Sequence, residues 1–220
     1  FGPQGLISLV EEERYSRVRH AKIAGIGNTD RLPWESIDRA LSAANVSMPQ
    51  IACVAYSFDP DARFAAAGRV PDDPDIPAGD YGSPAGERRL RDQVLATGRL
   101  LAERYQCAPD MRFVPHHLSH LAAAYYSCPW DEAALLSVDG IGEDDTASWG
   151  RGRGGKIEVL GRIEYPHSLG FLWEEITEHL GFRRNNDEGT VMALAAYGDA
   201  KCMNDKLRRL ARPLDDGTFF

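Results

Sequence analysis

A glycine- and arginine-rich turn between two strand-like segments is the feature that most constrains the fold of this chain. The sequence TASWGRGRGGKIEVLGRIEY, residues 146–165, predicts two strands joined by a hairpin. A hairpin requires antiparallel pairing, whereas elsewhere strand patterns alternate with helical patterns along the chain. The sequence therefore predicts an α/β protein with a mixed sheet.

Hydrophobic spacing places the other elements. Short apolar runs bounded by glycine or charge predict further strands at 6–10, 51–58, 111–114 and 133–139. Helical spacing and helix-start residues predict helices at 33–45, 87–105, 116–127, 169–182, 189–198 and 200–211. The segment 69–86 is dense in Pro, Asp and Gly, and it predicts a loop.

Composition excludes several classes of protein. The formal net charge of −8 argues against a nucleic-acid partner, because phosphate binding needs a clustered basic surface. No apolar run reaches the ~18 residues that a membrane span needs. The four cysteines are far apart without CxxC spacing, which favours a reducing cytoplasm. Both ends of the sequence look cut, and we expect a fragment of a longer protein.

Three of the six histidines fall within five residues, in the stretch VPHHLSHLAAAYYS. If a helix begins at or just before His116, then His116 and His120 project from the same face, because residues four apart are neighbours on a helix. His117 then points about a quarter-turn away. Two imidazoles at this spacing are a familiar way to hold a transition metal.

A carboxylate is available to complete such a site. Asp139 ends the apolar strand LLSVD, and ligand sites of α/β folds lie at the carboxyl ends of strands. Taken alone, the histidines are explained equally simply as helix caps or as partners of carbonyl groups. Taken alone, Asp139 is explained as a turn residue before glycine. Their joint presence favours a metal site of two histidines and one carboxylate, which suits Fe(II), Mn(II) or Zn(II).

The turn that follows Asp139 is a candidate nucleotide contact. Gly140 and Gly142 allow backbone N–H groups to approach an anion closely, as in turns that bind phosphate. Glu143 is a candidate to orient a water, a ribose or a metal-bound ligand, or else it faces solvent.

Two predicted helix starts are further candidates for this contact. Ser168 is a helix-start signal, and the helix N-terminus behind it is suited to a phosphate, although a plain cap explains the serine equally well. Glu188 and Gly189 precede a helix of small residues, which permits close packing or close approach of a nucleotide.

Five segments, taken in order, resemble O-carbamoyltransferases of the nodulation-protein and antibiotic-tailoring type. They are EEERYSRVRH, VPHHLSHLAAAYYSCPW, LLSVDGIGEDDTASWGRG, YPHSLGFLWEEITEHLGF and DEGTVMALAAYGD. The resemblance covers almost the whole chain and is weakest from about 21 to 110. Five ordered matches are far more specific than any one motif.

The resemblance implies an ATPase fold like that of actin, the sugar kinases and the heat-shock chaperone ATPases, which is ribonuclease H-like, with only part of the domain present. Residues 1–138 would form the first subdomain and 139–220 the start of the second. A C-terminal YrdC-like domain would lie outside this chain. That domain makes carbamoyl-adenylate from carbamoyl phosphate and ATP, and the first domain transfers the carbamoyl group to a hydroxyl of a small-molecule acceptor.

The resemblance also implies site residues. His116, His120 and Asp139 match the family's ligands for an iron(II)-type metal, and a fourth ligand, an aspartate, would follow Phe220. Arg19 stands where many members carry a lysine just before His20, next to the reactive phosphate and carbamoyl group. Thr190 replaces another frequent lysine, and the family's HDA motif would precede Phe1.

Two other functions remain open from the sequence. One is a different metal-dependent ATPase or kinase of the same fold, which the histidine pair disfavours. The other is a non-catalytic module that binds a metal or a nucleotide.

Overall fold

The computed structural model describes residues 1–2, 5–18, 32–68, 82–199, 201–215 and 218–219. The chain divides into two compact units, Phe1–Val114 and Pro115–Phe220, and both combine helices with strands. The class is therefore α/β, as the sequence predicts, but the described residues form one parallel and one antiparallel sheet and no single mixed sheet. The division after residue 138 that the family resemblance implies concerns a longer protein and stays a prediction.

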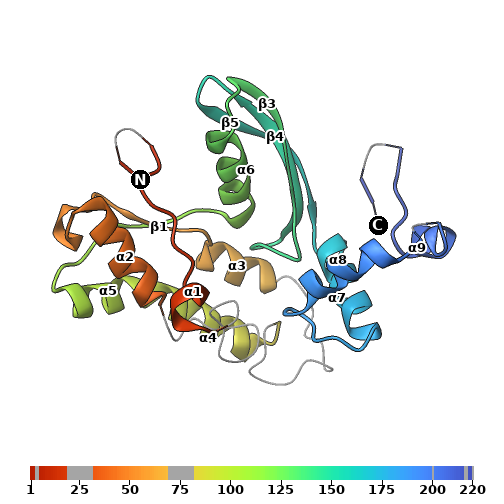
Figure 1. The fold of residues 1–220 in the computed structure, drawn as a ribbon, viewed down its shortest axis with the longest axis horizontal. Helices are drawn as coiled ribbons and strands as arrows, with labels where there is room; N and C mark the ends of the chain where they lie inside the picture. The colour runs from red at the N-terminus through yellow and green to blue at the C-terminus, as the bar shows by residue number, and fades with distance from the viewer. Residues whose placement is uncertain (3–4, 19–31, 69–81, 200, 216–217, 220) are drawn as a thin grey trace. The chain divides into compact units, whose positions relative to one another are not determined.

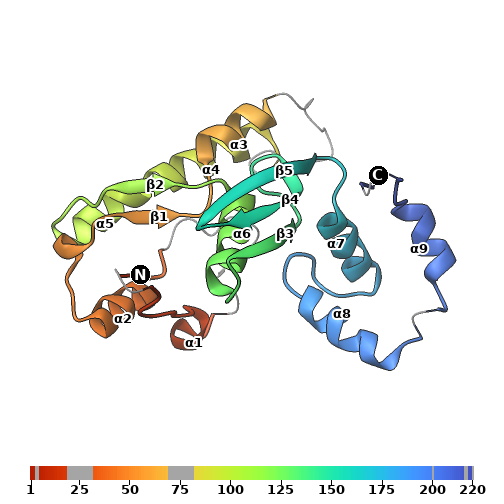
Figure 2. The same cartoon turned by 90° about the horizontal axis from the view of Figure 1, so that it is seen from above.

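The first unit is mainly helical. Its elements are α1 (Glu13–Ser16), α2 (Trp34–Ala44), the 3-10 helix η2 (Met48–Gln50), β1 (Val54–Tyr56), α3 (Pro60–Ala67), α4 (Pro84–Leu95), α5 (Thr97–Tyr105) and β2 (Met111–Phe113). Figure 1 labels β1 and the helices of this unit, and Figure 2 shows β1 beside β2, with which it pairs in parallel. Its core cluster centres on Leu32, Met48 and Leu101.

The second unit is built on a three-stranded antiparallel sheet in the order β3-β4-β5 (Figure 2). Its elements are α6 (His116–Ser127), β3 (Glu132–Val138), β4 (Asp145–Arg153), β5 (Lys156–Glu164), α7 (Leu169–His179), α8 (Glu188–Leu194), the 3-10 helix η3 (Ala195–Tyr197) and α9 (Asn204–Leu210). The predicted hairpin is confirmed. Gly154 and Gly155, which join β4 to β5, both have positive φ, a conformation open to glycine but costly for other residues.

Helix α6 packs on one face of this sheet through a close contact with a glycine. The Tyr125 ring lies over Gly152, where an added Cβ would come within 2.3 Å of the ring. The Tyr125 hydroxyl donates to the Asp131 carbonyl and accepts from the Gly155 N–H. Leu121 is fully buried beside Tyr125. These contacts fix α6 against the sheet, and with it the helical end that carries the histidines.

Most predicted elements are confirmed, including the helix that stops at Asn45, a residue in the left-handed conformation. The loop predicted at 69–86 lies outside the described residues up to 81, and its last three residues begin α4. Two other predictions are wrong. The segment Leu6–Val10 forms no strand, and Leu9 is 85% exposed. A strand needs a neighbour for its backbone hydrogen bonds, and no described residue pairs with this segment. The single helix predicted at 87–105 is two helices, which meet at Ala96.

Among the described residues, no helix is both long enough and apolar enough to cross a membrane.

A buried ion pair holds α3 to α4 in the first unit. The Arg63 guanidinium donates to both carboxylate oxygens of Glu87, at 3.0 and 2.6 Å. The side chains are only 10% and 3% exposed. Glu87 also accepts from the Gly82 N–H. Removal of the Glu87 carboxylate would take this two-bond ion pair from a buried guanidinium, and such a loss is costly.

We expect Glu87→Ala to lower the free energy of unfolding by about 3–5 kcal/mol, measured by urea denaturation. The matched control is Glu103→Ala, which removes the exposed partner of Arg99 and should cost less than about 0.5 kcal/mol. Equal losses from the two substitutions would show that burial does not set the strength of the Arg63 pair.

Candidate metal centre

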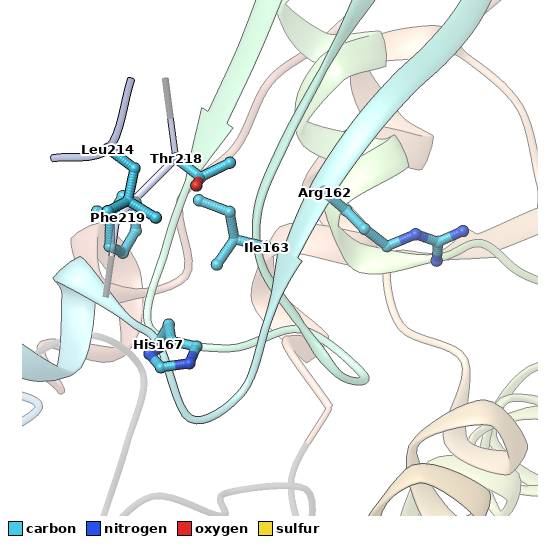
Figure 3. A pocket seen from close by; sticks show the side chains of 6 residues that line it. All are labelled: Arg162, Ile163, His167, Leu214, Thr218 and Phe219. Atoms are coloured by element: carbon cyan, nitrogen blue, oxygen red, sulfur yellow. The ribbon is translucent and has the colours of Figure 1, made fainter. Parts of the chain in front are cut away.

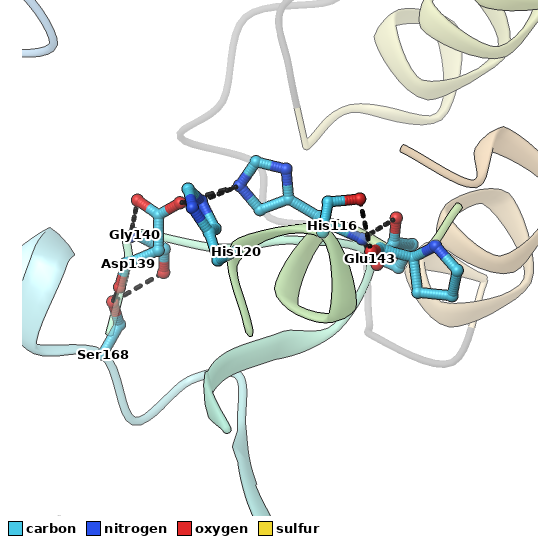
Figure 4. A network of polar contacts seen from close by, with 8 residues as sticks. His116, His120, Asp139, Gly140, Glu143 and Ser168 are labelled. Atoms are coloured by element: carbon cyan, nitrogen blue, oxygen red, sulfur yellow. Dashed lines mark hydrogen bonds and ion pairs between the residues drawn. The ribbon is translucent and has the colours of Figure 1, made fainter. Parts of the chain in front are cut away.

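The second unit brings together two histidines and one aspartate, as the sequence predicts. His116 is the first residue of α6 and His120 lies one turn later, while Asp139 follows directly after β3. The Asp139 Oδ2 atom lies 2.7 Å from the His116 Nε2 atom and 3.2 Å from the His120 Nε2 atom (Figure 4). The two Nε2 atoms are 3.1 Å apart. Among the described residues, this is the cluster whose ligand atoms could hold a metal ion.

Protons alone cannot satisfy this triangle of atoms. Each Nε2 carries at most one hydrogen, and an ionised carboxylate only accepts. If both histidines donate to Asp139, the two N–H groups converge on the Oδ2 atom and the 3.1 Å contact between the rings is not a hydrogen bond. If His120 donates to His116 instead, then His116 has no proton left for Asp139. At most two of the three contacts can therefore be hydrogen bonds, whereas a cation among the three atoms is attracted to all of them, so the residues fit a metal ion.

Asp139 is held in its charged form. Burial opposes ionisation of this carboxyl, but hydrogen bonds from His116, from the Gly140 N–H and from His120 outweigh it and hold the pKa well below its usual range. The Gly140 N–H donates to the Asp139 Oδ1 atom at 2.7 Å. That bond leaves Oδ2 directed at the histidines, in the ionised state that binds metals.

His117 is not part of this cluster, which agrees with its predicted quarter-turn offset. Its side chain is buried, and neither ring nitrogen has a hydrogen-bond partner in the part of the chain that the structure describes. Burial, and then the neighbouring His116, lowers the pKa of His117. A neutral ring at this position packs against Gly142 of the loop after Asp139.

The loop after Asp139 contacts the start of α6. Both carboxylate oxygens of Glu143 accept from the His116 N–H, at 3.0 and 3.1 Å. Gly142 lies against the same turn, where an added Cβ would be 3.0 Å from the His116 Cβ atom and 3.0 Å from the His117 ring. Gly142 and Glu143, two of the predicted nucleotide contacts, therefore lie in the loop and contact the helix that carries the histidines.

The other side of the loop contacts the start of α7. Ser168 caps this helix by accepting from the Phe171 N–H, and its hydroxyl donates to the Gly140 carbonyl at 2.6 Å. Gly170 lies directly on the Asp139–Gly140 peptide, where an added Cβ would come within 2.4 Å of the Gly140 nitrogen. Periodicity alone does not reveal Gly170, because the contact joins segments 30 residues apart.

Glu174, from the next turn of α7, also lies near this loop. An added Cβ on Gly140 would be 3.5 Å from a carboxylate oxygen of Glu174. The Glu174 side chain is 18% exposed, and burial raises its pKa although Arg184 opposes the shift. The sequence did not single out this residue.

The remaining predicted site residues lie elsewhere. Glu188 accepts from the Asn185 N–H at the start of α8, and Gly189 has open space around it. That hydrogen bond involves neither the histidines nor Asp139, although burial, helped by the charge of Glu188, raises the pKa of Glu174 beside Gly140. Arg19 and His20 lie outside the described residues.

A pocket also opens beside the end of β5, apart from the cluster (Figure 3). It is lined by Arg162, Ile163, His167, Leu214, Thr218 and Phe219. None of these residues belongs to the cluster of His116, His120 and Asp139. Thr146 in β4 connects the pocket to the cluster. Its hydroxyl donates to the His167 carbonyl, and its own carbonyl accepts from the Asp139 N–H.

Comparison with known proteins identifies the family. A family model described as carbamoyltransferase N-terminus matches residues 81–219, which include the three clustered side chains. The chain belongs to this family.

Three relatives show how much of a longer protein the chain represents. It is 30% identical to the uncharacterized protein sll1178 of Synechocystis sp. over 97% of this chain and 35% of that relative. It is 29% identical to Nodulation protein NolNO of Sinorhizobium fredii over 97% of this chain and 29% of the relative. The uncharacterized protein MJ1058 of Methanocaldococcus jannaschii is 32% identical over 40% of this chain and 17% of its own length. The chain thus spans about a third of the first two relatives.

We expect Gly170→Ala to destabilise the protein by about 1–3 kcal/mol, because the new Cβ must displace backbone rather than a flexible side chain. Gly189→Ala is the matched control in a helix with open space, and it should stabilise by about 0.5–1 kcal/mol. Urea denaturation of both variants measures the difference. A neutral Gly170→Ala would mean that α7 does not lie this close to Asp139.

We expect the effect of Glu174→Gln on stability to depend on pH. A raised pKa means that the folded protein binds more protons than the unfolded chain as pH rises above about 4.3, so the carboxyl costs stability at neutral pH. The variant should gain thermal stability relative to wild type near pH 7 and gain least below about pH 4. Glu175→Gln, which removes an exposed carboxylate that also contacts Arg184, controls for the loss of charge. The same pH trend in both variants would rule out burial as the cause.

Proposed function

We propose that this chain is the carbamoyl-transferring part of an O-carbamoyltransferase. The observation that carries the proposal is the convergence of His116, His120 and Asp139 within the region that matches the family model. In the proposed reaction, a hydroxyl oxygen of the acceptor bonds to the carbamoyl carbon of carbamoyl-adenylate. The bond from that carbon to the AMP phosphate oxygen breaks, AMP leaves, and the hydroxyl proton is released to a base.

The three clustered side chains would hold the metal. Two imidazole nitrogens and one carboxylate oxygen suit Fe(II), Mn(II) or Zn(II), and we propose iron(II) from the family resemblance. When bound, such an ion offsets negative charge on a phosphate or a leaving oxygen. Asp139 contributes a fixed negative charge, and the side chains of His116 and His120 are partly exposed, so a ligand can reach them.

The N-terminal end of α7 would attract the phosphate of the adenylate. Helix α7 has eleven residues, and its positive N-terminal end lies against Gly140. An anionic phosphate beside Gly140 would therefore be favoured by the helix dipole. We further propose that Arg19 and His20 lie next to the carbamoyl group, by resemblance alone.

The rest of the proposal concerns the complete protein. We propose that its fold is that of the actin, sugar-kinase and heat-shock ATPase group, divided after residue 138, and that a YrdC-like domain makes the carbamoyl-adenylate from ATP and carbamoyl phosphate. The acceptor is proposed to be a hydroxyl-bearing small molecule such as an antibiotic precursor. The mixed α/β class and the family support this proposal.

The proposal predicts that the complete protein, purified anaerobically, contains about one equivalent of transition metal. His120→Ala and Asp139→Ala should lose the metal, together with AMP release that depends on carbamoyl phosphate and acceptor. His179→Ala is the matched control, because this histidine ends α7 and lies outside the cluster. Metal content is measured by elemental analysis and AMP by chromatography.

Two outcomes would contradict the proposal in different ways. Metal that survives in both His120→Ala and Asp139→Ala would place it elsewhere in the protein. Full AMP release by these variants would show that the three side chains do not take part in carbamoyl transfer.

A further inference from the structure

We propose that Glu143 is a positioning residue, whose carboxylate sets the place of His116 and His120 relative to Asp139. This role rests on the proposed metal centre. It differs from the contact with water, ribose or a metal-bound ligand that the sequence suggests for Glu143, because it assigns the carboxylate to the protein's own backbone.

Helix α6 needs a partner for its first N–H groups, and its own N-cap does not supply one. Residue Pro115 precedes the helix and makes no side-chain cap. Glu143 takes this role from another segment, since its two oxygens both accept from the His116 N–H. A carboxylate at this position is also favoured by the positive end of the helix dipole. The Glu143 residue is only 9% exposed, so solvent competes weakly for these bonds.

The cap and the aspartate ligand belong to the same short loop. Asp139 and Glu143 are four residues apart, and the loop between them is closed by two backbone bonds. The Asp139 N–H donates to the Thr146 carbonyl at 2.9 Å, and the Gly142 N–H donates to the Asp145 carbonyl at 2.8 Å. One closed loop therefore carries Asp139 and also binds, through Glu143, the start of the helix that carries His116 and His120 (Figure 4).

Gly142 brings this loop into contact with the helix. An added Cβ would lie 3.0 Å from both the His116 Cβ atom and the His117 ring, which is tighter than ordinary side-chain contacts. A larger residue would push the loop away from α6 and lengthen the bonds of Glu143. A substitution of Gly142 is thus a second way to separate the loop from α6, in a variant that still has the Glu143 carboxylate.

The test is a titration of the metal-free complete protein with Co(II) alone, followed by visible absorption. Glu143→Ala should weaken Co(II) binding by about tenfold to a hundredfold, as is typical for residues that orient ligands. Its saturated spectrum should change, because the absorption of Co(II) reports the arrangement of its ligands. Glu143→Gln keeps one oxygen that can accept from the His116 N–H, and it should restore binding to within about threefold of wild type.

Two further variants keep the result decisive. Glu158→Ala removes an exposed carboxylate on β5 in the same unit and should bind Co(II) as wild type does. Gly142→Ala should weaken Co(II) binding and shift the spectrum with Glu143 unchanged. If circular dichroism shows that Glu143→Ala does not fold, the Co(II) titration of Gly142→Ala tests the positioning role instead.

The outcomes separate the two proposals. Wild-type affinity and spectrum in both Glu143→Ala and Gly142→Ala would overturn the positioning role. Weaker ATP binding in Glu143→Ala, with Co(II) binding unchanged, would overturn it in favour of a nucleotide contact. If His116→Ala binds Co(II) as tightly as wild type, then the proposed metal centre itself fails.

Discussion

The second unit is organised around three polar atoms that are too close together for protons alone to satisfy. His116, His120 and Asp139 meet at 2.7–3.2 Å, from the start of one helix and the end of one strand. The three contacts cannot all be hydrogen bonds, so the surrounding structure must hold these atoms together. Packing of α6 on the sheet through Tyr125 and Gly152, and pairing of β3 with β4, supply that support.

The loop after Asp139 is held on both sides by bonds to the first turns of helices. Glu143 binds the start of α6, and the Gly140 carbonyl accepts from Ser168, the cap of α7. In both places a glycine lets backbone come close, Gly142 on the loop and Gly170 on α7. The loop of residues 139–144 therefore carries Asp139 and sets the separation of two helices in this unit.

The sequence predicts the three clustered residues because each obeys a local rule. The spacing of His116 and His120 follows helical periodicity, and Asp139 follows an apolar run that must be a strand. The contacts of Glu143, Ser168 and Gly170 depend on which segments meet in space, and spacing along the chain does not encode that. The wrong strand at 6–10 has the same cause, because an apolar run shows strand character but not whether a partner is present.

The bond between Ser168 and the Gly140 carbonyl gives α7 a mechanical role. The serine hydroxyl donates to the loop while it accepts from the helix, so it belongs to both at once. Helix α7 therefore cannot slide along its axis without breaking this bond or dragging the Asp139 backbone with it. Gly170 blocks motion in the opposite sense, since the helix already rests on that peptide. A molecule that pushes or pulls on α7 will therefore displace Asp139 first, and will reach His116 and His120 only through the Glu143 carboxylate at the other side of the loop.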